Sequence, residues 1–134
     1  MKKLYYLVLL LLSLKALSQN VESTKALMKK SYDELINEYF NNLDNKPNAD
    51  KIISAYLKKA KIDNNTVKIA YGYFNISYYN PNAIKSMVYM DSMFAYSKKI
   101  NHSGFPAMGF VYKARIYSAN GLINKCLDEI FDCI

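Results

Sequence analysis

The 134-residue chain contains one histidine, two cysteines, four glycines and no tryptophan. A His-rich metal site or a Ser-His-Asp triad would have to be built on His102 alone, and no cysteine or acidic cluster lies near it in the sequence. The glycines Gly72, Gly104, Gly109 and Gly121 are dispersed, which excludes a Gly-rich phosphate-binding loop. We therefore expect no metal, no cofactor and no catalytic residue, so that the protein is not an enzyme.

Acidic residues offer no better candidate for catalysis. Asp91 stands alone, and Asp128, Glu129 and Asp132 lie on one predicted helix near the C-terminus. Paired carboxylates serve acid-base chemistry or bind cations, but acids on amphipathic helices are usually surface charges. The sequence predicts the latter.

The two cysteines lie seven positions apart on the same predicted helix. Seven helical residues span about 10 Å, whereas a disulfide needs Cα atoms within about 7 Å. Cys126 and Cys133 are therefore predicted not to pair with each other within an intact helix. Two alternatives stay open for them, namely small core residues or a disulfide between two chains.

A formal net charge of +7 is no evidence for nucleic-acid binding, because the basic residues are not clustered. Three lysines lie in the first fifteen residues, and without them +7 falls to +4. The others are scattered pairs such as Lys29-Lys30, Lys58-Lys59 and Lys98-Lys99. These pairs indicate solvated helix surfaces and predict no direct contact with nucleic acid.

The N-terminal segment has the three parts of a bacterial secretory signal. Lys2 and Lys3 precede the apolar run Leu4–Leu12, and small residues follow. A membrane span needs about 20 apolar residues, so the run is too short to be one. We expect a signal peptide over 1–18, cleavage after Ser18, and an exported protein that is periplasmic or secreted. An uncleaved signal is the alternative, and it would be the only attachment to a membrane.

Apolar residues recur at spacings of three and four along the rest of the chain, which is typical of amphipathic helices. Ser31 with Glu34 predicts a capping box, Pro47 and Pro106 predict first helical positions, and Asp63-Asn64-Asn65 predicts a third helix start. The first expected helix runs from about Ser23 or Ser31 to Leu43, and the others cover about 48–61, 66–79, 83–100, 106–119 and 123–134. Their expected inward residues include Ile52, Ile53, Tyr56, Leu57, Ala60, Val67, Ala70, Tyr71, Phe74, Tyr78, Ile84, Met87, Val88, Met90, Met93, Phe94, Ile100, Phe110, Ala114 and Tyr117.

No stretch alternates with the period of two that marks a strand, and the predicted turns are short. The expected class is therefore all-α, built of antiparallel helix hairpins. Hairpins that begin near Ser31, Asn64 and Phe105 lie 33 and 41 residues apart, which suggests an irregular internal repeat.

The last predicted hairpin resembles the tetratricopeptide repeat (TPR). Its aromatic, small and turn positions match those at which the two helices of that repeat pack together. The matching residues are Phe110, Ala114, Tyr117, Gly121, Cys126, Ile130 and Cys133. The resemblance implies a TPR-like domain over 19–134, with about three helix pairs stacked as a right-handed superhelix.

The range Ser31–Ile134 is also similar to the exported, TPR-containing N-terminal region of bacterial sensory transcriptional regulators and histidine kinases. The similarity rests on Tyr73-Phe74, on Tyr89-Met90-Asp91-Ser92 and on the stretch Ile100–Ala114. Such proteins continue into further repeats, a membrane helix and an output domain, so the resemblance implies that the repeat domain is truncated at its C-terminal end.

Two functions follow from these resemblances. The first is a non-enzymatic protein-protein interaction module, whose concave face is lined by Tyr71, Tyr78 and Tyr112 and holds a protein or peptide. The second is the sensory N-terminal fragment of a longer membrane-bound regulator. In either case the partner is expected to be a protein, a peptide or a second copy of the chain bound through the C-terminal helix pair.

Overall fold

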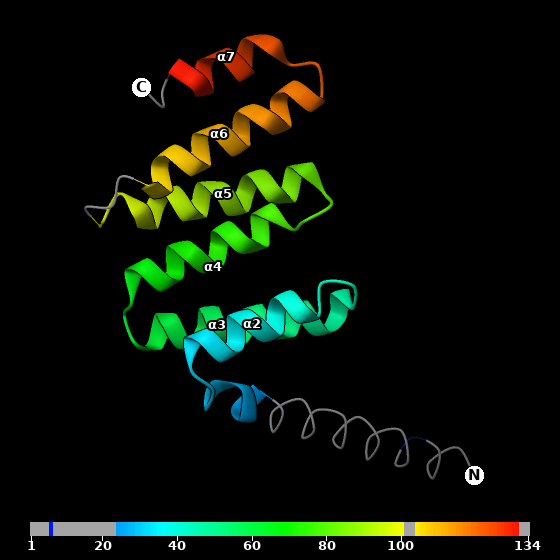
Figure 1. Ribbon diagram of the computed structural model, residues 1–134, viewed down its shortest axis with the longest axis vertical. Helices are drawn as coiled ribbons and strands as arrows, with labels where there is room; N and C mark the ends of the chain where they lie inside the picture. Colours follow the sequence, from blue (N-terminus) through cyan, green and yellow to red (C-terminus); the bar gives the residue numbers. More distant parts are fainter. Residues whose placement is uncertain (1–5, 7–23, 101–103, 132–134) are drawn as a thin grey trace. The chain divides into compact units, whose positions relative to one another are not determined.

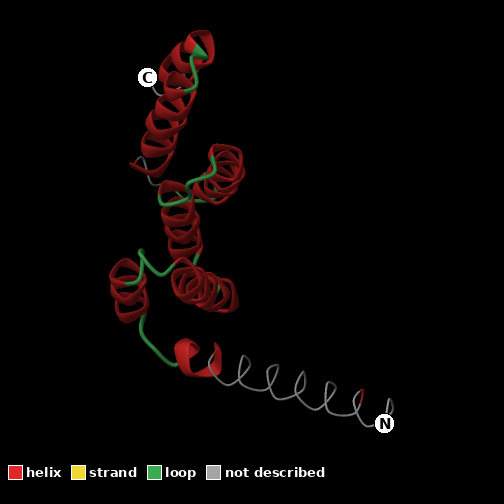
Figure 2. Cartoon of the chain, turned by 90° about the vertical axis from the view of Figure 1, so that its right-hand side faces the viewer, coloured by secondary structure: helices red, strands yellow, loops and turns green. Residues whose placement is uncertain are grey.

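The computed structural model describes Tyr6, residues 24–100 and residues 104–131. Within this part of the chain the regular elements are helices and no strand occurs (Figure 2), so the predicted all-α class is confirmed. The helices are α2 (Tyr32–Asn41), α3 (Lys46–Ile62), α4 (Thr66–Tyr78), α5 (Ala83–Ser97), α6 (Gly104–Ala119) and α7 (Ile123–Phe131).

Several sequence predictions fall outside the described residues, namely the signal peptide over 1–18 and the residues His102, Asp132 and Cys133. Among the residues that are described, no helix combines the length and the apolar character needed to cross a membrane.

Short polar side chains start the helices where the sequence predicted them. Ser31 and Glu34 form the expected capping box, with each side chain bonded to the other residue's backbone N–H. The Asn65 side chain accepts the Lys68 N–H at 3.1 Å and so caps α4. Asn82 does the same for α5 through the Lys85 N–H at 2.9 Å. Each cap satisfies a backbone donor that has no partner within its own helix.

Two predicted helix starts are wrong by one or two residues. α3 begins at Lys46 and α6 at Gly104, so that Pro47 and Pro106 lie inside the first turn rather than at its first position. In α3 the Asn45 side chain accepts the Asn48 N–H at 3.3 Å, which moves the start toward the N-terminus. Proline is tolerated there because the first four N–H groups of a helix lack internal partners in any case.

The chain divides into two compact units, Met1–Tyr56 and Leu57–Ile134. In the first unit, α2 and the first part of α3 bury Leu35, Tyr39 and Ile52. The Tyr32 and Tyr56 rings meet edge to face, with centroids 5.2 Å apart. Aromatic pairs of this geometry contribute beyond their buried area, so this contact joins the two helices.

In the second unit, α4, α5, α6 and α7 follow one another as antiparallel neighbours (Figure 1), and α4 also contacts α6. The core of this unit comes from three helices, with Ala70 on α4, Met90 and Met93 on α5, and Phe105 on α6. Half-buried side chains surround it, namely Tyr71, Tyr73, Phe74, Phe94, Tyr96, Ile100 and Tyr112.

Two buried serines join α4 and α5 near their connecting turn. The Ser77 Oγ lies 2.8 Å from the Ser86 carbonyl oxygen, and the Ser86 Oγ lies 2.5 Å from the Ser77 carbonyl oxygen. Both side chains are almost fully buried, so these hydroxyls satisfy polar groups that water cannot reach. The small size of serine also allows the two helices to approach closely.

Most of the residues predicted to point inward are buried or half-buried, but four are not. Val67, Tyr78, Ile84 and Val88 are 40%, 43%, 78% and 59% exposed. Helical spacing identifies the whole apolar face of a helix, but neighbouring helices cover only part of that face. The apolar residues on the uncovered part stay exposed. Ile84 and Val88 lie on a side of α5 that the described helices leave open. Tyr78 lines a groove between α4 and α6.

Candidate binding groove between α4 and α6

Helices α4 and α6 lie side by side and run in the same direction, as their ring contacts demonstrate. The Tyr71 and Phe105 rings have centroids 6.4 Å apart. The Tyr78 and Tyr112 rings are stacked, with centroids 5.1 Å apart. Each pair is separated by 34 residues in the sequence, so the register between the two helices stays constant over two turns.

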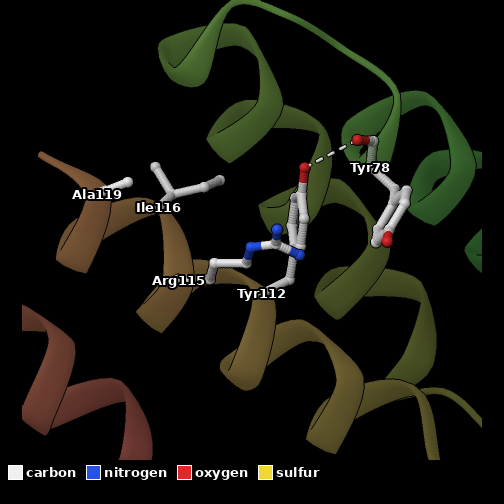
Figure 3. Close-up of a pocket in the computed structure, with 5 residues that line it drawn as sticks. All are labelled: Tyr78, Tyr112, Arg115, Ile116 and Ala119. Atoms are coloured by element: carbon white, nitrogen blue, oxygen red, sulfur yellow. Dashed lines mark hydrogen bonds between the residues drawn. The ribbon is translucent and has the colours of Figure 1, made fainter.

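The Tyr112 hydroxyl fixes the end of α4 against α6. It lies 2.9 Å from the carbonyl oxygen of Tyr78 (Figure 3). It also lies 3.4 Å from the carbonyl oxygen of Ser77. The Ser77 carbonyl also accepts the Asn80 N–H and the Ser86 hydroxyl. The Tyr78 carbonyl is the last of α4, and the last carbonyls of a helix have no donor within that helix. Tyr112 therefore supplies a donor to the Tyr78 carbonyl and stacks on the Tyr78 ring.

Two open depressions lie along this contact, with volumes of about 290 and 210 Å³. They share Tyr78, Tyr112 and Arg115. The larger is completed by Ile116 and Ala119, and the smaller by Phe74, Met108 and Val111. Together these eight residues define the α4–α6 groove. Its lining is apolar and aromatic apart from the tyrosine hydroxyls and one guanidinium group.

Arg115 is the one arginine of the chain and the one charged residue in the groove lining. It is exposed, and it forms no hydrogen bond or ion pair with any of the described residues. In Figure 3 its side chain lies beside Tyr112 on the groove side of α6. A planar guanidinium with five donors is thus available at the point where the two depressions meet.

Two lysines of this unit, Lys61 and Lys99, are engaged with tyrosines. The Lys61 Nζ lies 3.0 Å from the Tyr73 hydroxyl. This hydrogen bond raises the pKa of Lys61 above its ordinary value, despite some desolvation. The Lys99 Nζ lies over the Tyr96 ring, 5.0 Å from its centroid. Arg115 is therefore a better candidate than these two lysines for binding an external group.

Lys113 links three helices and has a structural role. Its side chain is only 15% exposed, and its Nζ lies 2.8 Å from Asp91 Oδ1 on α5 and 3.4 Å from Glu129 Oε1 on α7. Desolvation lowers the pKa of Lys113, but Asp91 and Glu129 outweigh it, so the pKa is raised overall. The ammonium stays charged at neutral pH and holds α7 against α6. Asp91 and Glu129 are thus ion-pair partners.

The residues predicted to occupy TPR packing positions do not form one cluster in the structure. Ala114 is buried, and the centroid of the Phe110 ring lies 4.8 Å from that of the Phe94 ring on α5. Gly121 takes a φ of +72° in the turn between α6 and α7, a conformation that favours glycine. The Lys125 Nζ lies over the Tyr117 ring, 5.7 Å from its centroid. Cys126 is half-buried with a free thiol, and Ile130 is 43% exposed.

Sequence reasoning found part of the groove. It predicted that Tyr71, Tyr78 and Tyr112 line one concave face. In the structure Tyr78 and Tyr112 line the groove, whereas Tyr71 contacts Phe105 and lies outside the groove lining. It missed Met108, Val111 and Arg115. The available signal was a second apolar stripe on α6, at Met108 and Val111, outside the stripe that packs on α5.

Among the described residues no group of three or more His, Cys, Asp or Glu side chains is placed to hold a metal ion. The fold and the groove define an all-helical protein made of antiparallel hairpins that carries an open aromatic surface. No protein-family model matches the chain, and neither does any curated protein or solved structure.

Proposed function

We propose that this chain is a TPR-like protein-protein interaction module that acts outside the cytoplasm and binds a peptide segment in the α4–α6 groove. The observation that carries the proposal is the groove itself, in which apolar side chains stay exposed between two parallel helices. Val111 is 62% exposed and Met108 43% exposed, beside the stacked Tyr78 and Tyr112 rings. Gathered apolar surface of this kind commonly marks interaction sites.

The TPR-like arrangement is supported by the register of the second unit. The 34-residue offset of the Tyr71–Phe105 and Tyr78–Tyr112 pairs equals the length of a tetratricopeptide repeat. It also accounts for the contact between α4 and α6, the first helices of successive hairpins. Export is supported by the lysines and apolar run within residues 1–18.

Replacing Val111 by aspartate is expected to abolish peptide binding. A charge placed among apolar groove residues loses hydration when a peptide covers it. The measurement is binding of the purified chain to an array of random heptapeptides, with the wild type expected to select a subset. The control is Val88→Asp, which makes the same change at a valine of similar exposure, 59%, on α5. Equal binding by both variants would contradict the groove as the binding site.

An uncovered apolar surface on α7 favours a second association. No residue of α7 is buried in the described part of the chain. Ile123, Leu127 and Phe131 are 56%, 46% and 70% exposed. In a sensory regulator a further repeat would cover this surface, and we propose that a second copy covers it in the isolated chain.

Replacing Phe131 by aspartate is therefore expected to convert a concentration-dependent dimer into a monomer. The change places a charge at the most exposed apolar side chain of α7. Light scattering over a range of concentrations measures it, with reductant present so that cysteine oxidation is not the cause. A wild-type chain that stays monomeric throughout would refute association through α7.

A further inference from the structure

The α4–α6 groove places one cation between two apolar ends. Arg115 lines both depressions. Ile116 and Ala119 continue the lining in one depression, and Phe74, Met108 and Val111 continue it in the other. No Asp or Glu lines either depression, so nothing in the groove competes for the guanidinium.

The charge of the surrounding unit favours an anionic partner. Residues 57–134 contain ten Lys and Arg against five Asp and Glu. Two of those acids, Asp91 and Glu129, are paired with Lys113. The potential around Arg115 is therefore positive, which attracts and orients a negatively charged segment.

From this arrangement we infer that the groove selects an internal acidic residue flanked on both sides by apolar residues. The inference rests on the proposed peptide-binding function and specifies the partner. The anion is placed at Arg115, in the middle of the groove, and apolar side chains of the same segment occupy the two ends. A C-terminal carboxylate has chain on only one side of it and would leave one end empty.

The size of the groove sets the length of the segment. The α6 positions that line it run from Met108 to Ala119, which is about 16 Å at 1.5 Å per residue. An extended chain advances about 3.3 Å per residue. The groove therefore holds about five extended residues, with the acidic one at the centre.

The test uses the full chain and three fluorescein-labelled synthetic peptides whose binding is followed by fluorescence anisotropy. The first has the core Leu-Leu-Asp-Leu-Leu between blocked glycines, and the second replaces its Asp by Asn. The third ends in Leu-Leu-Asn with a free carboxyl group. We expect the first to bind about fivefold more tightly than the other two, which is the upper end of the range for one exposed ion pair.

Arg115→Gln is expected to remove this fivefold preference by lowering the affinity for the Asp peptide alone. Raised salt is expected to lower the same affinity in the wild type. Lys98→Gln removes an equal charge from an exposed position outside the groove lining and should leave the preference intact. Equal affinity for the Asp and Asn peptides, or tighter binding of the third peptide, would overturn the inference.

The outcomes for the acidic preference and for the groove are separable. Array peptides that bind the wild type and are lost in Val111→Asp, yet show no acidic preference, would refute the inference and leave the proposed function standing. An array with no bound peptide would refute both.

Discussion

Met90→Ala is expected to lower the free energy of unfolding by about 2–5 kcal/mol, the usual cost of truncating a buried Met to Ala. Met90 is fully buried on α5 and packs in the core that α4, α5 and α6 share. Removing its side chain leaves a cavity among helices that cannot fully close around it, because their spacing is also set by neighbouring contacts. Small domains have net stabilities of about 5–15 kcal/mol, so the loss is a large fraction of the total.

Urea unfolding followed by circular dichroism measures this effect. Met108→Ala is the matched control, because it makes the same truncation at a side chain that is 43% exposed in the groove. That variant is expected to lose less than about 1 kcal/mol, since a partly hydrated side chain contributes less burial. Similar losses for the two variants would mean that Met90 does not occupy the core.

Gly109→Val is expected to destabilise the protein by about 1–3 kcal/mol through overpacking. A Cβ atom at Gly109 would lie 2.5 Å from Phe94 Cζ and 2.6 Å from Met93 Cε, both closer than real Cβ contacts allow. Alanine would regain up to about 1 kcal/mol of helix propensity over glycine, whereas valine adds two further methyl groups at the same crowded place. Valine is therefore the more decisive test of the close approach of α6 to α5.

A double-mutant cycle of Gly109→Val with Met93→Ala tests whether a clash with the Met93 side chain causes this loss of stability. Removing the Met93 side chain makes room for the new valine, so the two losses of stability are expected to be less than additive. Ser118→Val, at an exposed position on the same helix, measures the cost of a β-branched residue without a clash. Strict additivity in the cycle would exclude contact between residues 93 and 109.

The groove was predictable only in part, and the missing part has a physical reason. Tyr78 and Tyr112 were expected on a concave face because the chain resembles proteins of stacked helix pairs. Whether an apolar stripe is covered depends on which helix lies beside it, and sequence spacing carries no such information. For this reason Val88 was expected to be buried and is exposed, and Val111 was not recognised as part of a surface.

The helices themselves could be predicted more fully than the groove. The approximate bounds of α2 to α7 and several of their caps follow from local sequence, because each backbone hydrogen bond joins residues four apart and each cap acts over three. The helical residues 24–28 before α2 were not predicted as a separate helix. Ser31 with Glu34 and the side chain of Asn65 start α2 and α4 through neighbours in the chain.

The arrangement of the helices was decided by tertiary structure. The stacking of Tyr112 on Tyr78, the close approach of the Phe94 and Met93 side chains to Gly109, and the unpaired state of Arg115 all depend on how the helices pack together. Local periodicity determines that a helix forms and which of its faces is apolar. Only packing against other helices determines which part of that face becomes core and which part remains open to a partner.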